Sequence, residues 1–132
     1  MHYLRSRLEM VAKPWFTLNY HGYRIKFDFC PRTQTCTICG TKGYSNIHHT
    51  LYNFSRREVQ DNNRLALLFT FEVCYQDHLV ANAVRMIMEQ DPNVKIKTSS
   101  EKVRKIFENH QRLYKERNIW NKKHRINGKI VI

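Results

Sequence analysis

Two widely separated groups of metal-binding side chains constrain the fold of this chain more than any other feature. Cys36 and Cys39 form a C-x-x-C pair in CTICG. Far along the chain, the segment CYQDH supplies Cys74 with either Asp77 or His78. Two thiolates two residues apart can hold zinc from one tight turn. We therefore expect a structural Zn2+ that ties the first half of the chain to the segment after Cys74 and compensates for a small core.

Disulfides are the competing use of cysteines, and they are typical of secreted proteins. The N-terminal MHYLRSRLEMVAKPWF lacks the apolar core of a secretion signal, and no apolar run has the length of a membrane span. We therefore expect a soluble, intracellular (cytoplasmic) protein whose C-x-x-C binds metal, with a reduced core thiol pair as the alternative. Cys30 is expected to be a free thiol that ends a hairpin, and it is an alternative fourth zinc ligand.

The charge of the chain favours a polyanionic partner. Among 132 residues, 23 Lys and Arg oppose 11 Asp and Glu, and the formal net charge is +12. Nucleic acid is the expected partner, because aromatic residues are interleaved with the charges and no basic amphipathic membrane anchor stands out. The alternative is a basic surface that contacts only solvent. The length predicts a single domain over residues 1–132.

The first half of the chain is expected to be rich in strands. Residues 1–30 are read as an N-terminal arm, 1–13, followed by a hairpin with strands Trp15–Tyr20 and Tyr23–Phe29 around His21-Gly22. NIHHTLYNF is typical of a short strand, and Ser55 with Glu58 has the spacing of a capping box. The apolar run LALLFTFEV fits either a strand or a helix.

The second half is expected to be helical. Residues 77–90 have apolar side chains at helical spacing, and Asp91-Pro92 marks the end of that helix. Its core face is expected to carry Leu79, Val80, Ala83, Val84, Ile87 and Met88. Residues 98–132 are read as a basic amphipathic helix, opened by a Thr98–Glu101 capping box, and a tail that turns at Asn127-Gly128.

The adjacent histidines His48 and His49 are expected to have different functions, because neighbouring side chains on a strand point to opposite sides. If His48 binds a catalytic divalent ion, His49 is free to take a proton from water near physiological pH. The alternative is that both are structural and bonded to backbone carbonyls.

The order of C-x-x-C, IHHT and DNNRLALLFTFEVCYQDHLVANAVR resembles the zinc-stapled HNH endonucleases, over roughly residues 36–85. The resemblance implies a ββα-metal core, two strands and a helix, within residues 36–90. In that family the residue before the conserved histidine binds the metal, and the histidine is the general base. Carried over, His48 is a ligand of a catalytic Mg2+ or Mn2+, and His49 is the base.

The resemblance also assigns roles around the second cysteine. Asp77 stands where the family has its last cysteine, which makes His78 the second ligand of the catalytic ion. Asn82 falls where some members place a further histidine, and Asn62 or Asn63 corresponds to the asparagine that orients the base. In the other register His78 is itself the fourth zinc ligand, and the catalytic ion has too few ligands. We favour the first register, because His78 and Asn82 share a helix face.

Basic side chains near these positions are expected to contact phosphates, with duplex or branched DNA as the substrate. The candidates are Arg56, Arg57, Arg85, Lys102, Lys105, Arg112, Lys122, Lys123 and Arg125. The sequence thus predicts an α+β protein with an N-terminal β-hairpin, a zinc-stapled ββα-metal core and a basic C-terminal helix. The predicted function is metal-dependent hydrolysis of phosphodiester bonds. The alternative is a noncatalytic zinc module or regulator that binds nucleic acid.

Overall fold

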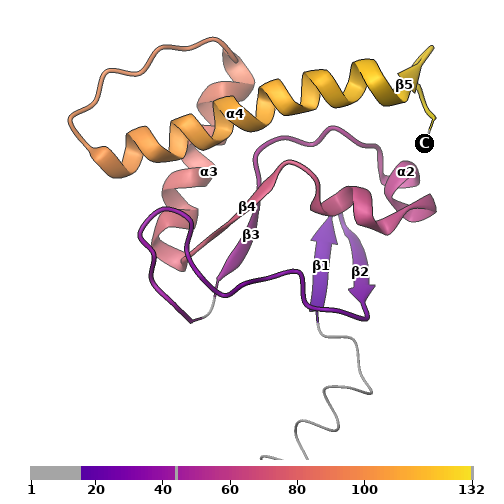
Figure 1. Cartoon of the computed structure of the whole chain (residues 1–132), viewed down its shortest axis with the longest axis horizontal. Coiled ribbons are helices and arrows are strands. Elements are labelled where there is room, and N and C mark those ends of the chain that lie inside the picture. Colours follow the sequence, from indigo (N-terminus) through magenta and orange to yellow (C-terminus); the bar gives the residue numbers. More distant parts are fainter. Residues whose placement is uncertain (1–15, 44, 132) are drawn as a thin grey trace, which may run out of the picture. The chain divides into compact units, whose positions relative to one another are not determined.

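A computed structural model describes residues 16–43 and 45–131, so the expected N-terminal arm lies outside the described residues. In these ranges the chain is mixed α+β (Figure 1). It divides into two compact units. Unit 1 holds the described residues up to Thr33 together with Phe54–Ala66, and unit 2 holds Gln34–Asn53 together with the chain from Leu67 onward. The single domain expected over 1–132 stays a prediction. No helix in the described ranges is long and apolar enough to cross a membrane.

Unit 1 begins with the expected hairpin. Strands β1 (Phe16–Tyr20) and β2 (Tyr23–Phe27) are antiparallel, and Tyr20 faces Tyr23 across the turn. His21 and Gly22 both have positive φ angles, 49° and 79°, as the two-residue turns that match strand twist require. The second strand ends two residues earlier than expected.

A short helix completes unit 1. Helix α2 (Arg56–Asp61) begins with the predicted capping box, in which the Ser55 side chain accepts from the Glu58 N–H and the Glu58 carboxylate accepts from the Ser55 N–H. A 3-10 helix, η1 (Asn63–Leu67), follows. The Tyr20 hydroxyl donates to the Phe54 carbonyl at 2.8 Å, which fastens the end of β1 to the chain entering α2. The buried apolar side chains of this unit are Tyr20, Ile25, Phe27, Phe54, Val59, Leu65 and Ala66.

A second antiparallel hairpin opens unit 2. Strand β3 (Asn46–His49) pairs with β4 (Thr70–Val73), so that His48 faces Phe71 and His49 faces Thr70. The apolar run LALLFTFEV, which fitted either a strand or a helix, contains parts of both, since η1 ends at Leu67 and β4 begins at Thr70. The reversal between them uses Phe69, whose φ angle is 61°.

Helix α3 (Tyr75–Gln90) follows β4 directly, and its buried row is Asp77, Ala81, Val84 and Met88. The expected core face is therefore wrong for Leu79 and Ile87, which are 56% and 43% exposed, and for Ala83, which is also exposed. The physical reason lies at the first turn. Because the Asp77 carboxylate is buried, the helix face that continues from Asp77 in steps of three and four residues also points inward. Leu79 lies on a different face of the helix.

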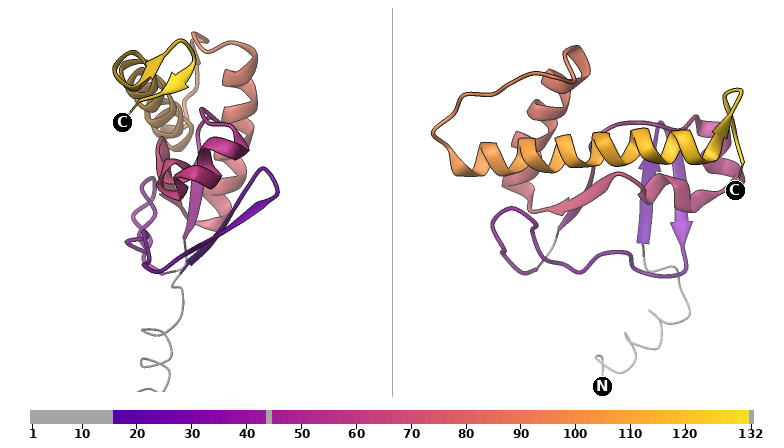
Figure 2. Two further views of the ribbon diagram at one scale, coloured as in Figure 1. Left: turned by 90° about the vertical axis from the view of Figure 1, so that its right-hand side faces the viewer. Right: turned by 45° about the horizontal axis from the view of Figure 1, so that its top comes forward.

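Helix α4 (Glu101–His124) packs against α3, and Figures 1 and 2 show that the two helices cross rather than run side by side. Its N-cap is Ser100, whose hydroxyl accepts from the Val103 N–H, so the predicted Thr98–Glu101 capping box is wrong. The Thr98 hydroxyl instead accepts from the Ser100 N–H, in the turn before the helix. The buried stripe of α4 is Ile106, Phe107, His110 and Leu113. The tail forms β5 (Arg125–Ile126) and β6 (Lys129–Ile130).

Candidate metal centre and histidine cluster

The loop that carries the C-x-x-C pair is held against β4 by hydrogen bonds to the backbone and side chain of Glu72. The Thr37 N–H donates to the Glu72 carbonyl at 2.9 Å. The Glu72 carboxylate accepts from the Gln34 N–H and the Ser45 hydroxyl, both at 3.0 Å. Gly40 closes the loop with a φ angle of 75°, a conformation that favours glycine. Because β4 leads directly into Cys74, these bonds bring the two halves of the predicted zinc site together.

Four side chains meet where this loop reaches the start of α3. The ligand atoms of Cys36, Cys39, Cys74 and Asp77 all lie within 4.8 Å of one another. The sulfurs of Cys39 and Cys74 are 3.9 Å apart. Two sulfurs bound to one tetrahedral zinc are about 3.8 Å apart, given Zn–S bonds of about 2.3 Å. This cluster is therefore able to hold a metal ion such as zinc, and its fourth member is Asp77, as the favoured register predicts.

The electrostatics around Asp77 favour its charged form. Burial by itself would raise the pKa of Asp77, but hydrogen bonds from Lys102 and Cys36 hold the pKa below its usual range. Lys102 Nζ lies 2.9 Å from Asp77 Oδ1, and the Cys36 thiol donates to Asp77 Oδ2 at 3.2 Å. Desolvation raises the pKa of Cys74 to about 11. A metal that binds this thiol as a thiolate must therefore displace its proton.

A second cluster consists of histidines, and His48 on β3 is at its centre. The His48 ring is fully buried, and its centroid lies 5.3 Å from that of His78 on α3. His48 Nε2 lies 3.0 Å from Nε2 of His110 on α4. His110 is also fully buried, and Phe71 packs edge-on against both of these buried rings. Three imidazoles from three elements of unit 2 thus converge.

The surroundings of all three rings favour the neutral form. Burial, together with the neighbouring histidines, lowers the pKa of His48 to about 2. Burial lowers the pKa of His110 to about 4, despite a hydrogen bond to the Ile106 carbonyl that works in the opposite direction. Burial and the positive charge of Arg85 lower the pKa of His78. Neutral imidazole is the form that binds metals.

His49 lies beside this cluster and is 6% exposed. Its ring stacks on Tyr52, with centroids 5.4 Å apart and planes 18° from parallel. Arg85 on α3 donates to the His49 carbonyl at 3.0 Å, and its guanidinium lies over the same Tyr52 ring. The backbone of the proposed base is therefore fastened to the helix that carries His78.

The asparagines assigned by resemblance have local partners. Asn62 is the C-cap of α2, and its side-chain oxygen accepts from the Arg64 N–H. The Asn63 side-chain oxygen accepts from the Tyr23 hydroxyl at 3.3 Å. Both belong to unit 1, and a role for either in orienting His49 stays a prediction. Asn82 is half-buried on α3.

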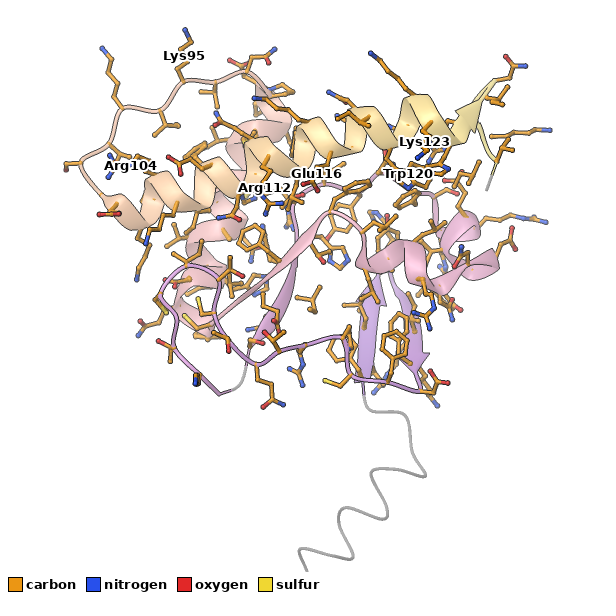
Figure 3. The ribbon with its side chains drawn as sticks, in the orientation of Figure 1. Lys95, Arg104, Arg112, Glu116, Trp120 and Lys123 are labelled. Carbon is orange, nitrogen blue, oxygen red and sulfur yellow. The ribbon has the colours of Figure 1, made fainter. Side chains whose placement is uncertain are left out.

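The candidate phosphate contacts differ in how they are engaged. Lys105, Lys122 and Lys123 are exposed on α4, and Figure 3 shows Arg104, Arg112 and Lys123 distributed along this helix. Arg56 and Arg57 are exposed on α2 in unit 1. Lys102 pairs with Asp77, and Arg112 pairs with Glu116. Arg125 donates to the Asn53 and Gly128 carbonyls and to the Asn121 side chain, so it fastens the tail of the chain.

His110 is the member of the histidine cluster that sequence reasoning missed. The apolar stripe of its helix predicts that it is buried, but nothing in that spacing connects it to His48. The usable signal is chemical: an imidazole in an otherwise apolar stripe needs a polar partner in the core.

Comparisons of the chain with protein-family models, with curated proteins and with solved structures found no match. The function is therefore inferred from the side chains themselves.

Proposed function

We propose that this protein is a metal-dependent endonuclease of the HNH type, with a zinc-stapled ββα-metal core. The observation that carries the proposal is the 5.3 Å separation of the His48 and His78 rings, which come from a strand and the following helix. His48 and His78 would hold a divalent ion such as Mg2+ or Mn2+, with Asn82 as a further candidate. His49, next to His48 in the chain, would be the general base.

The local topology supports this assignment. β3 and β4 are antiparallel neighbours, and α3 begins two residues after β4 ends. The Cys36, Cys39, Cys74 and Asp77 cluster lies at the junction of β4 and α3, so a metal there would fix the helix that carries His78. The chemistry of the donors fits as well, because His48 is neutral and its Nδ1 has no hydrogen-bond partner among the described residues.

The reaction would be hydrolysis of a phosphodiester. His49 takes a proton from water, the water oxygen bonds to phosphorus, and the bond to the leaving oxygen breaks. A divalent ion at His48 and His78 would stabilise the negative charge that develops on the phosphate. Arg85 holds the His49 backbone and adds positive charge beside all three rings of the cluster.

The exposed basic side chains of α4 support a nucleic-acid substrate. Exposed Lys and Arg residues are present in its first turns, at its middle and in its last turns, for example Lys105, Arg112 and Lys123. A row of this kind suits the phosphate backbone of duplex or branched DNA, whose binding weakens steeply with salt. Binding that is independent of salt would contradict this surface.

One observation favours a second function, a noncatalytic zinc module that binds nucleic acid. His49 is 6% exposed beneath the Tyr52 ring, and a general base must reach its water. In that case His48 and His49 only pack and hydrogen-bond inside unit 2. The basic surface and the zinc cluster would be retained without hydrolysis.

Plasmid nicking with added Mg2+ or Mn2+ separates the two functions. The nuclease predicts metal-dependent nicking by the wild type and by His124→Ala, a histidine of unit 2 that packs on Trp120 instead. It predicts a loss of at least about a hundredfold in His49→Ala, the contribution typical of a general base. Equal rates for wild type and His49→Ala would remove His49 as the base, and no nicking at all, with DNA binding intact, would favour the noncatalytic module.

A further inference from the structure

The contacts of His110 determine which nitrogen of His48 is available to a metal ion. We propose that His110 is a positioning residue: it accepts the Nε2 proton of His48 and so presents the Nδ1 lone pair of His48 as the ligand atom of the divalent ion. This deepens the proposed function and rests on it, because the ion concerned is the one assigned to His48 and His78.

The first step concerns the proton on His110. Its Nδ1 lies 2.8 Å from the Ile106 carbonyl oxygen, one turn earlier in α4. A carbonyl oxygen accepts hydrogen bonds and cannot donate, so Nδ1 of His110 carries the proton. In a neutral imidazole the other nitrogen is then an acceptor. His110 Nε2 therefore carries a lone pair, and it lies 3.0 Å from His48 Nε2.

The second step follows at His48. Two ring nitrogens 3.0 Å apart, one of them an acceptor, form a hydrogen bond only if the other carries the proton. The Nε2 atom of His48 must be that donor, and its Nδ1 is consequently unprotonated. This Nδ1 is fully buried and has no hydrogen-bond partner among the described side chains and backbone groups.

The third step is energetic. A buried acceptor without a partner loses the hydrogen bonds that water would otherwise give it, and nearly all buried acceptors in proteins have a partner. A cation bound at His48 Nδ1 satisfies this atom, and the His78 ring is near enough to contribute a second nitrogen. The same chain of bonds, from the Ile106 carbonyl through His110 to His48, is the kind of outer support that fixes the tautomer of metal-binding histidines.

Nitrogen-15 NMR of the imidazoles tests the inference directly, on the full chain with one equivalent of Zn2+ in the cysteine cluster. The expected spectrum has His110 protonated at Nδ1, which is the minor form of free histidine, and His48 protonated at Nε2. A second equivalent of Zn2+, used as a diamagnetic probe, should shift His48 Nδ1 and leave its Nε2–H in place. A proton on His48 Nδ1, or zinc on His48 Nε2 or on His110, would overturn the inference.

Two substitutions of His110 give an independent readout in Mn2+ binding, followed by the loss of the free-ion EPR signal. His110→Gln places an amide oxygen close to the position of Nε2 and keeps an acceptor, whereas His110→Leu has none. His110→Leu should weaken Mn2+ binding by about 10- to 100-fold, the range for outer supports of metal ligands, and His110→Gln should restore most of it. Equal Mn2+ affinities in the wild type and in a folded His110→Leu protein would count against the inference. If His110→Leu does not fold, the NMR spectrum of the wild type decides the question.

Failure of the inference and failure of the nuclease remain distinguishable. Metal-dependent nicking by a protein whose His48 is protonated at Nδ1 would retain the nuclease and reject the role of His110. Zinc at His48 Nδ1 without any nicking would retain the role of His110 and reject hydrolysis.

Discussion

Lys102 Nζ lies 2.9 Å from Asp77 Oδ1, so the basic helix α4 contacts the candidate metal cluster at the start of α3. Three thiolates and one carboxylate carry two more negative charges than a zinc ion neutralises, and a lysine beside them offsets one. The contact also accounts for the raised pKa of Lys102, which comes mainly from its hydrogen bond to Asp77. This lysine was predicted to bind phosphate, and its partner in the structure is the carboxylate.

Lys102→Met should therefore weaken zinc binding, by about tenfold or more, as is common for groups that support metal ligands. Competition with a zinc chelator measures the effect. Lys105→Met is the matched control, since Lys105 is an exposed lysine of the same helix turn. Equal zinc affinities for the two variants would show that the Lys102–Asp77 pair does not support the site.

The identity of the zinc ligands gives a second prediction. Cys36→Ser should lose tightly bound zinc and lower the melting temperature, because metal binding that requires the folded state stabilises it. Cys30→Ser is the control, a half-buried thiol of unit 1 outside the cluster.

His78→Ala should retain one zinc per chain by elemental analysis. Loss of zinc in His78→Ala would instead make His78 the fourth ligand.

Acid should destabilise the metal-free protein through the buried histidines. The folded-state pKa values of His48 and His110, about 2 and about 4, lie below the usual histidine pKa of 6.5. The unfolded chain therefore binds more protons below pH 6.5, and stability falls as the pH falls from 6.5 toward these values. Each histidine contributes about 1.4 kcal/mol per pH unit in that window. Urea unfolding of chelator-treated protein between pH 7.5 and 5 measures the slope of the unfolding free energy against pH. In a folded His110→Gln protein this slope should be smaller by about one proton. An unchanged slope would show that His110 does not contribute to the pH dependence.

Arg85 connects the proposed base to the helix of His78 through its bond to the His49 carbonyl. Arg85→Lys keeps a charge but loses the planar guanidinium that lies over Tyr52. We expect nicking to fall by about 10- to 100-fold, because small displacements of a catalytic group are costly. Arg24→Lys, at an exposed position on β2, should leave the rate unchanged. A similar rate for both variants would remove Arg85 from the mechanism.

The basic face of α4 predicts a salt dependence. Replacing Lys122 and Lys123 by Gln should weaken DNA binding uniformly across sequences and reduce the slope of log affinity against log salt by about two. Lys95→Gln, in the exposed loop before α4, is the control. An unchanged slope in the double variant would place the DNA elsewhere on the protein.

The sequence predicts local structure well where the signal is itself local. The His21-Gly22 turn and the Ser55–Glu58 capping box depend on nearby residues only, and both are confirmed. The cap of α4 was misassigned because Thr98 and Ser100 both satisfy simple capping rules, and the backbone leading into the helix selects Ser100.

The parts that could not be predicted depend on contacts between distant residues. The sequence left two registers for the fourth member of the cysteine cluster, Asp77 or His78, and the choice depends on the Asp77 carboxylate turning inward, which also leaves Leu79 exposed. His110 meets His48 across 62 residues of sequence. Periodicity predicts that such a residue is buried, but it carries no information about the element opposite.

The central claim, that imidazoles from β3 and α3 share one hydrolytic ion, is tested most directly by measuring Mn2+-dependent plasmid nicking in His78→Ala against His124→Ala, with zinc content monitored in both. We predict that both proteins retain one zinc, that His124→Ala nicks plasmid at the wild-type rate, and that His78→Ala loses nicking together with Mn2+ binding. Nicking by a zinc-loaded His78→Ala protein at the wild-type rate and with the wild-type dependence on Mn2+ would contradict the account.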